Sequence, residues 1–197
     1  MRDDIGRPPR WLRLAGVLWF VIALVLGGTG RVAALRPPAP QLVLGGLTVG
    51  LLLLGRTAPG VRGWLRTLDP RATLTLHLTR FVGIYFLVLH RRGELPGQFA
   101  VPGGWGDIAV ASLALVLLLV PAEPKWWRAA VIGWNVLGLL DILFVVATAA
   151  RLATADPGSM AAMLRLPLSL LPTFLVPLII ATHVWLFARL RQTATGG

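Results

Sequence analysis

The sequence Ala129-Ala-Val-Ile-Gly-Trp-Asn-Val-Leu-Gly-Leu-Leu-Asp-Ile-Leu-Phe-Val-Val-Ala-Thr-Ala-Ala150 decides the fold class, because Asp141 is its single charged residue. A helix needs about 20 apolar residues to cross a bilayer core about 30 Å thick. A run of this length and composition therefore predicts a membrane-spanning α-helix rather than a helix of a soluble domain.

Similar apolar runs recur along the whole chain. Of its 197 residues, 56% are hydrophobic and 14% are charged, and the mean hydropathy is +0.75, which excludes an ordinary water-soluble domain. We predict an all-α, polytopic transmembrane helical bundle with six spans in one integral membrane domain, residues 1–197. The predicted spans are Leu14–Gly28, Gln41–Leu54, Ala72–His90, Asp107–Val120, Ala129–Ala150 and Met163–Ala188.

Basic residues between the spans predict the orientation. Twelve Lys or Arg fall on the side of the N-terminus and six on the opposite side, with Arg80 inside a span. Cytoplasmic segments carry the excess of basic residues, so both termini are expected in the cytoplasm, after an uncleaved first helix rather than a signal peptide. The twelve are Arg2, Arg7, Arg10, Arg13, Arg56, Arg62, Arg66, Arg71, Lys125, Arg128, Arg189 and Arg191, and the six are Arg31, Arg36, Arg91, Arg92, Arg151 and Arg165.

The net charge of +11 makes membrane lipids the expected partner. The basic residues lie between apolar runs without a helix-turn-helix, zinc-binding or RNA-binding motif, so nucleic-acid binding is not expected. The chain has no cysteine, which excludes disulfides, thiolate nucleophiles and Cys-ligated clusters. No metal site is expected, and other membrane subunits are the second kind of partner considered.

Two histidines lie at similar predicted depth, each five residues from the cytoplasmic end of its span. They are His77 in the third span and His183 in the sixth. Two imidazoles at one depth on different helices suit axial ligation of a b-type haem, with Arg80 placed to hold a propionate. A metal site, a proton relay, or structural hydrogen bonds to carbonyls and hydroxyls are the alternatives.

Arg80 must either reach the membrane surface or meet a carboxylate inside the bundle, because its charge cannot be removed. Asp141 is its expected partner, since the depths of the two residues differ by about 6 Å at a rise of about 1.5 Å per residue. The pair is either structural or a proton-linked gate. Asp141 shares a helix face with Trp134 and Gly138, whereas Asn135 lies on another face and is a further candidate for a substrate or proton pathway.

The segment 93–107, Gly-Glu-Leu-Pro-Gly-Gln-Phe-Ala-Val-Pro-Gly-Gly-Trp-Gly-Asp, is apolar but rich in glycine and proline. We expect an irregular loop that lies at the interface, folds back or lines a cavity, with Asp107 at the N-terminus of the next helix. Asp107 then either caps that helix or joins an outward-facing polar pocket for a substrate or protons. The other residues of that pocket are Tyr85, His90 and Glu94.

Three prolines, Pro167, Pro172 and Pro177, interrupt the sixth predicted span. A proline inside a helix leaves the carbonyl four residues earlier without its usual donor, so Pro177 frees the carbonyl of Thr173. The expected result is a kink that either shapes a cavity or bends the helix around the bundle.

Four segments together resemble a group of uncharacterised six-span bacterial inner-membrane proteins. They are Arg80-Phe-Val-Gly83, Leu95–Asp107, Asn135–Asp141 and Leu171–Pro177. The resemblance covers about half of the chain, from the third span to the sixth. It implies a shared fold and a place in the bacterial inner membrane, and it carries no established activity with it.

These observations lead to three hypotheses for function. The first is a buried polar site in which His77 and His183 bind a b-type haem or related ligand and Arg80 and Asp141 organise the charge. The second is proton-coupled transport of a small solute, with Asp107 and Asp141 titrating. The third is a non-catalytic subunit or assembly factor. No catalytic residue is assigned, because no nucleophile–base pair, HExxH motif or carboxylate dyad appears.

Overall fold

The computed structural model describes residues 8–122 and 125–192 of the chain. This part is all-helical, without strands, and contains six helices that are long and apolar enough to cross a membrane. The chain divides into two compact units: unit 1 comprises Met1–Asp69 and Met163–Gly197, and unit 2 comprises Pro70–Ala162. Arg2 and Arg7, and the side chain of Lys125, which contribute to the predicted charge bias, lie outside the described residues.

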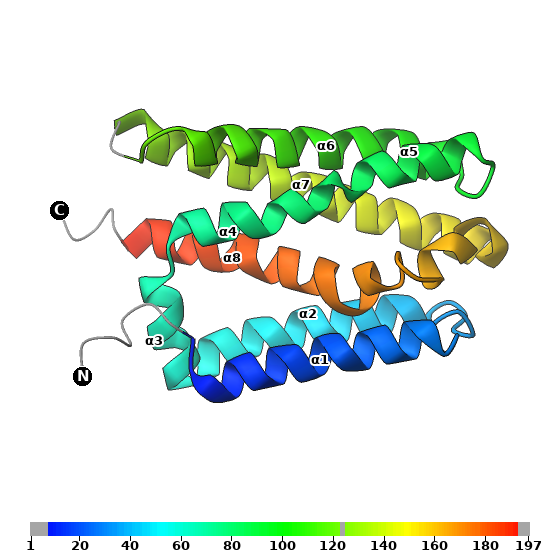
Figure 1. Ribbon diagram of the computed structural model, residues 1–197, viewed down its shortest axis with the longest axis horizontal. Coiled ribbons are helices and arrows are strands. Elements are labelled where there is room, and N and C mark those ends of the chain that lie inside the picture. Colours follow the sequence, from blue (N-terminus) through cyan, green and yellow to red (C-terminus); the bar gives the residue numbers. More distant parts are fainter. Residues whose placement is uncertain (1–7, 123–124, 193–197) are drawn as a thin grey trace. The chain divides into compact units, whose positions relative to one another are not determined.

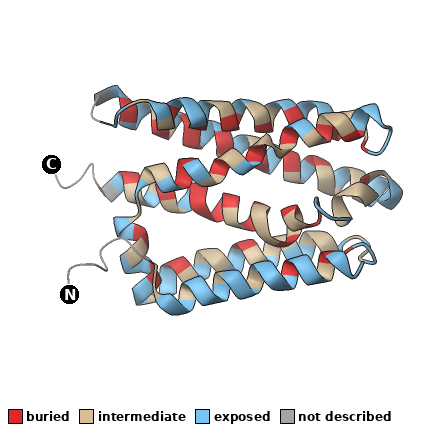
Figure 2. Ribbon diagram, viewed as in Figure 1, coloured by how far each residue is buried: buried red, intermediate tan, exposed pale blue. Residues whose placement is uncertain are grey.

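Unit 1 contains two long helices whose apolar side chains are mostly exposed or half-buried. Figure 2 shows most of α1 in the colour of exposed residues and α2 as a mixture of exposed and intermediate residues, and their leucines and valines account for much of this surface. Such a surface suits contact with lipid rather than water. The helices of this unit are α1 (Arg10–Gly28), α2 (Ala39–Thr57), the short amphipathic α3 (Pro59–Thr67), the π-helical turn η3 (Leu171–Leu175) and α8 (Val176–Gln192).

Unit 2 is more tightly packed and holds the buried charged residues. Figure 1 shows α6 beside both α5 and α7. The third membrane span is a single run of three pieces, because a 3₁₀ segment, η1, joins α4 to α5. The helices are α4 (Pro70–His77), η1 (Leu78–Val82), α5 (Gly83–Arg91), α6 (Gly97–Leu119), α7 (Lys125–Ala155) and the 3₁₀ segment η2 (Pro157–Leu164).

The irregular loop expected at 93–107 is wrong for most of its length. Helix α6 begins at Gly97 and contains Pro102, so the fourth span is 23 residues long and not short. Asp107 therefore lies in the interior of α6 and does not cap its N-terminus. In a membrane helix, packing against neighbouring helices compensates for the hydrogen bond that a proline removes.

The glycines of this segment serve helix packing rather than loop conformation. A Cβ atom at Gly104 would lie 2.9 Å from the carbonyl oxygen of Gly83 and 3.0 Å from the side chain of Leu87. Small residues let helix backbones approach closely in membranes. Several glycines in a short segment predict a loop in a soluble protein. Here they allow α6 to contact α5 closely.

The sixth span starts later than predicted, at Leu171 rather than Met163. Pro167 lies in a series of turns before the span, whereas Pro177 lies in the first turn of α8. The carbonyl of Thr173, which Pro177 leaves without its usual donor, accepts a hydrogen bond of 2.9 Å from the indole Nε1 of Trp19. A side chain of α1 thus satisfies the acceptor that the proline frees.

Candidate functional site: a buried arginine between two carboxylates

The third span changes from α-helix to 3₁₀-helix at its centre, over Leu78–Val82. Arg80 lies in this segment, and its side chain is 1% exposed. A 3₁₀ stretch inside a longer helix winds more tightly and commonly marks a hinge or a functional site. A guanidinium buried in a membrane span needs partners for its charge and its donors, and three other groups of unit 2 supply them.

Each nitrogen of the guanidinium donates to a different acceptor. Nε donates to Oδ1 of Asp107 on α6 at 2.6 Å, and Nη1 donates to the backbone carbonyl of Gly138 on α7 at 2.9 Å. Nη2 donates to Oδ2 of Asp141, also on α7. The Arg80–Asp141 ion pair expected from the sequence is confirmed, and Asp107 is a second carboxylate partner.

The two carboxylates differ in exposure and outnumber the cation. The side chain of Asp107 is 5% exposed and that of Asp141 is 15% exposed. With both carboxylates ionised, the cluster of Arg80, Asp107 and Asp141 carries a net charge of −1, and one bound proton brings it to zero. Burying net charge in a medium of low dielectric is costly, so the cluster is chemically suited to take up and release one proton.

Two glycines place the carboxylates against Arg80. A Cβ atom at Gly83 would collide with the carbonyl of Gly104 and would lie 2.8 Å from Cβ of Asp107. A Cβ atom at Gly106 would collide with the carboxylate of Asp141. The backbones of α5, α6 and α7 therefore approach each other closely only because these positions lack side chains.

A histidine and a tryptophan side chain pack against each other in the interior of unit 2. The ring of His77 packs edge-on against Trp134, with ring centroids 4.9 Å apart. Trp134 in turn donates its indole N–H to the carbonyl of Val110 on α6 at 3.0 Å. His77 is fully buried three residues before Arg80, which is about one turn of the 3₁₀ segment.

The other residues predicted for the site lie in several places. Asn135 is fully buried on α7. His183 is also fully buried, but it belongs to α8 of unit 1, whereas His77 belongs to unit 2. Haem ligation by these two histidines therefore stays a prediction.

Asp107 is not brought together with the polar groups at the start of α6. It lies ten residues into the helix, about 15 Å from the first turn at 1.5 Å per residue. Glu94 is exposed before that turn, and His90 contacts the carbonyl of Leu95 through Nδ1 at 3.2 Å. Tyr85 is partly buried on α5. His90 and Glu94 therefore lie apart from the Arg80 cluster along the membrane spans.

Sequence reasoning missed the roles of Gly83, Gly104 and Gly106. The string Gly103-Gly104-Trp105-Gly106 is plain in the sequence, but by composition alone it predicts a loop. A glycine three residues after a buried arginine, together with a glycine directly before a buried aspartate, is the signal that predicts close helix packing around an ion pair. The 3₁₀ segment itself has no comparable signal, because Leu78–Val82 contains neither glycine nor proline.

Comparison with known proteins identifies a family but no activity. A family model described as "Domain of unknown function (DUF8737)" matches residues 37–191. The match therefore includes the Arg80 cluster and the five spans from α2 to α8. No curated protein and no solved structure matches the chain.

Proposed function

We propose that this chain, which belongs to the DUF8737 family, couples the movement of a small solute across a membrane to the binding of a proton at the Arg80 cluster. The observation that carries the proposal is a single one. A fully buried guanidinium binds two carboxylates from two other helices at the point where its own span changes from α-helix to 3₁₀-helix. The bundle thus combines a site for a proton with a span that can change conformation at its 3₁₀ segment.

The proton site follows from charge balance. One guanidinium offsets one carboxylate, so the second carboxylate is neutral only when a proton is bound. Asp141, the more exposed of the two, is the group through which we expect the proton to enter and leave. Loss of the proton adds a negative charge beside Arg80 and changes the attraction between η1 and the two helices that hold the carboxylates.

The moving element follows from the change of helix type in the third span. A 3₁₀ stretch inside a longer helix often marks a functional hinge, at which the helix can change conformation. Here the Arg80 side chain links the 3₁₀ segment to carboxylates on α6 and α7 and to a backbone carbonyl of α7. Protonation of one carboxylate weakens one of these links, and the third span is free to shift against its neighbours.

We assign the chain to the bacterial inner membrane, with both termini in the cytoplasm. The excess of basic residues on the side of the N-terminus and the resemblance of four segments to six-span inner-membrane proteins support this assignment. In this orientation a solute would move along or against the proton gradient of the cytoplasmic membrane.

Reconstitution in liposomes tests the proposal. The vesicles enclose the pH-sensitive dye pyranine, and an imposed pH gradient is combined with a panel of sugars, amino acids and small organic cations, each added separately. We expect at least one solute to cause proton movement above that of empty vesicles. Asp107→Asn and Asp141→Asn should each abolish the movement, because an amide cannot release a proton.

Asp156→Asn is the matched control, because Asp156 is an exposed carboxylate of the same unit that lies outside the cluster. This variant should behave like the wild type. Solute movement that is independent of pH and unchanged in Asp141→Asn would contradict the proposal. No movement of any solute, together with purification in a larger membrane complex, would support a non-catalytic subunit instead.

A further inference from the structure

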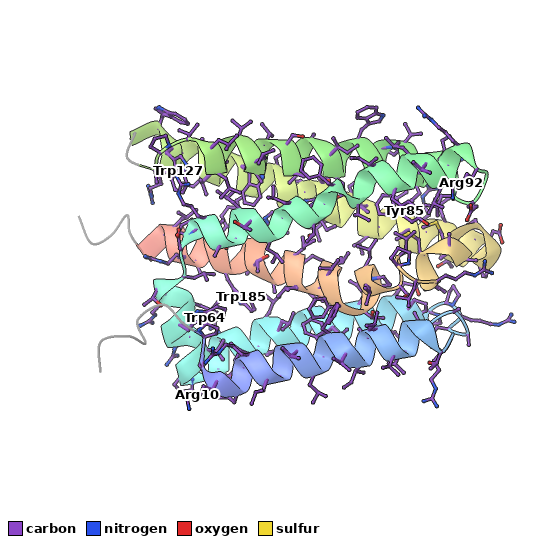
Figure 3. All side chains as sticks on the ribbon, viewed as in Figure 1. Arg10, Trp64, Tyr85, Arg92, Trp127 and Trp185 are labelled. Atoms are coloured by element: carbon purple, nitrogen blue, oxygen red, sulfur yellow. The ribbon has the colours of Figure 1, made fainter. Side chains whose placement is uncertain are left out.

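A cavity of about 450 Å³ lies in unit 1 between α2, α3 and α8, and four arginines line it. Its walls also include apolar side chains of all three helices and the ring of Trp185 (Figure 3). A volume of this size is enough for a small-molecule ligand or a lipid headgroup. The four arginines are Arg56, Arg62, Arg66 and Arg189.

The charge of this arginine cavity is not balanced by the residues that line it. None of the four arginines forms an ion pair within residues 8–122 and 125–192. Nε of Arg189 is buried and has no hydrogen-bond partner in the same part of the chain. Four guanidinium groups around one volume repel one another, so an anion that enters it gains both their attraction and an unused donor.

The helices around the cavity place it at a membrane surface. Arg56 lies in the last turn of α2, and Arg189 lies in the last turn of α8. The connecting helix α3 buries Val61 and Leu65 and exposes Arg62 and Arg66 on the neighbouring face. A short helix with one apolar and one basic face is typical of segments that lie in the interface between lipid and water.

We propose that the arginine cavity binds the phosphate group of an anionic phospholipid from the leaflet on that side. Guanidinium forks bind phosphate through paired N–H donors, whereas the apolar walls suit the start of the acyl chains. The same phosphate chemistry occurs in soluble phosphate compounds, and the experiment separates the two sources. The inference does not depend on the Arg80 cluster, which belongs to unit 2.

The test is native mass spectrometry of the detergent-solubilised full chain. Phosphatidylglycerol, phosphatidylcholine or inorganic phosphate is added to separate samples. We expect the wild type to retain one phosphatidylglycerol and to prefer it to phosphatidylcholine by at least tenfold. The double variant Arg62→Gln/Arg66→Gln should lose this preference, because both side chains are exposed on α3 and only their charge in the cavity is removed.

The matched control is Arg10→Gln/Arg13→Gln, which removes the same charge from the described start of α1 without altering the cavity. This control should bind phosphatidylglycerol like the wild type. Equal loss in both double variants would mean that only overall charge matters, and it would overturn the proposal. Retention of inorganic phosphate without retention of phosphatidylglycerol would overturn the lipid source and place a soluble phosphate compound in the cavity.

Discussion

At the scale of residues, Arg80 holds the buried cluster together. A single guanidinium satisfies two carboxylates and one carbonyl, so each group in the cluster depends on it. Removing one partner of a buried ion pair is far more costly than removing an exposed charge, because the remaining charges stay buried without compensation.

Arg80→Gln should therefore lower the free energy of unfolding by about 3–5 kcal/mol. Unfolding in mixed micelles by increasing sodium dodecyl sulfate, followed by tryptophan fluorescence, measures the change. Arg92→Gln is the control, because Arg92 is exposed beyond the end of α5 (Figure 3). A loss for Arg80→Gln that equals the loss for Arg92→Gln would show that the cluster does not stabilise the fold.

Arg71 has a structural role at the start of the third span. Its guanidinium donates to the carbonyls of Leu118 at 2.8 Å and Val120 at 2.5 Å, and it lies over the ring of Trp127. A cation at the C-terminal end of α6 satisfies carbonyls that lack helical donors. Arg71→Gln should cost about 1.5–3 kcal/mol of stability in the same assay, with proton movement in liposomes retained.

The membrane-spanning helices could be predicted from the hydropathy of the sequence. The Arg80–Asp141 pair could be predicted from the similar depths of the two charged residues. The second partner, Asp107, could not be predicted as such. Glycine and proline in 93–107 predict a loop when judged by soluble proteins, whereas a membrane helix tolerates both where neighbouring helices pack closely. The positions of Gly83 and Gly106 near charged residues indicate close packing, but the sequence alone does not show which helices meet at these glycines.

At the scale of elements, glycines set the spacing of α5, α6 and α7. Gly106 faces the carboxylate of Asp141, whereas a Cβ atom at Gly133 on α7 would meet nothing within 4 Å. Substituting each of these two glycines by alanine therefore separates the effect of helix packing on stability from the effect of helix propensity.

Gly106→Ala should destabilise the protein by about 1–3 kcal/mol, because the added methyl group forces α6 and α7 apart at the cluster. Gly133→Ala should leave stability unchanged or raise it by up to about 1 kcal/mol, since alanine favours the helix. Both changes can be measured by the same unfolding assay. Equal effects of the two substitutions would contradict the close contact of Gly106 with Asp141.

The sixth span depends on a side chain from α1 at its proline. Trp19→Phe keeps an aromatic ring against Phe174, whose centroid lies 4.6 Å from that of Trp19, but removes the donor to Thr173. The expected loss is about 0.5–1.5 kcal/mol. In a Pro177→Ala background the loss should be smaller, because residue 177 then offers a backbone N–H to the same carbonyl. A double-mutant cycle with the four proteins measures the difference.

At the scale of the whole molecule, the arrangement of basic residues predicts which loops face the cytoplasm. The chain has no cysteine, so single cysteines report topology without background. Arg92→Cys should react with a membrane-impermeant maleimide in intact cells. Thr67→Cys, at the exposed end of α3, should react only after the membrane is permeabilised. The reverse pattern would invert the predicted orientation.

Infrared spectroscopy of the reconstituted protein during a pH titration tests the central claim most directly. We expect the C=O stretching band of a protonated carboxyl group to change with pH in the wild type. One such component should be missing from Asp107→Asn or Asp141→Asn and retained in Asp156→Asn. If both cluster variants give the same carboxyl difference spectrum as the wild type, the Arg80 cluster exchanges no proton and is a purely structural ion-pair network.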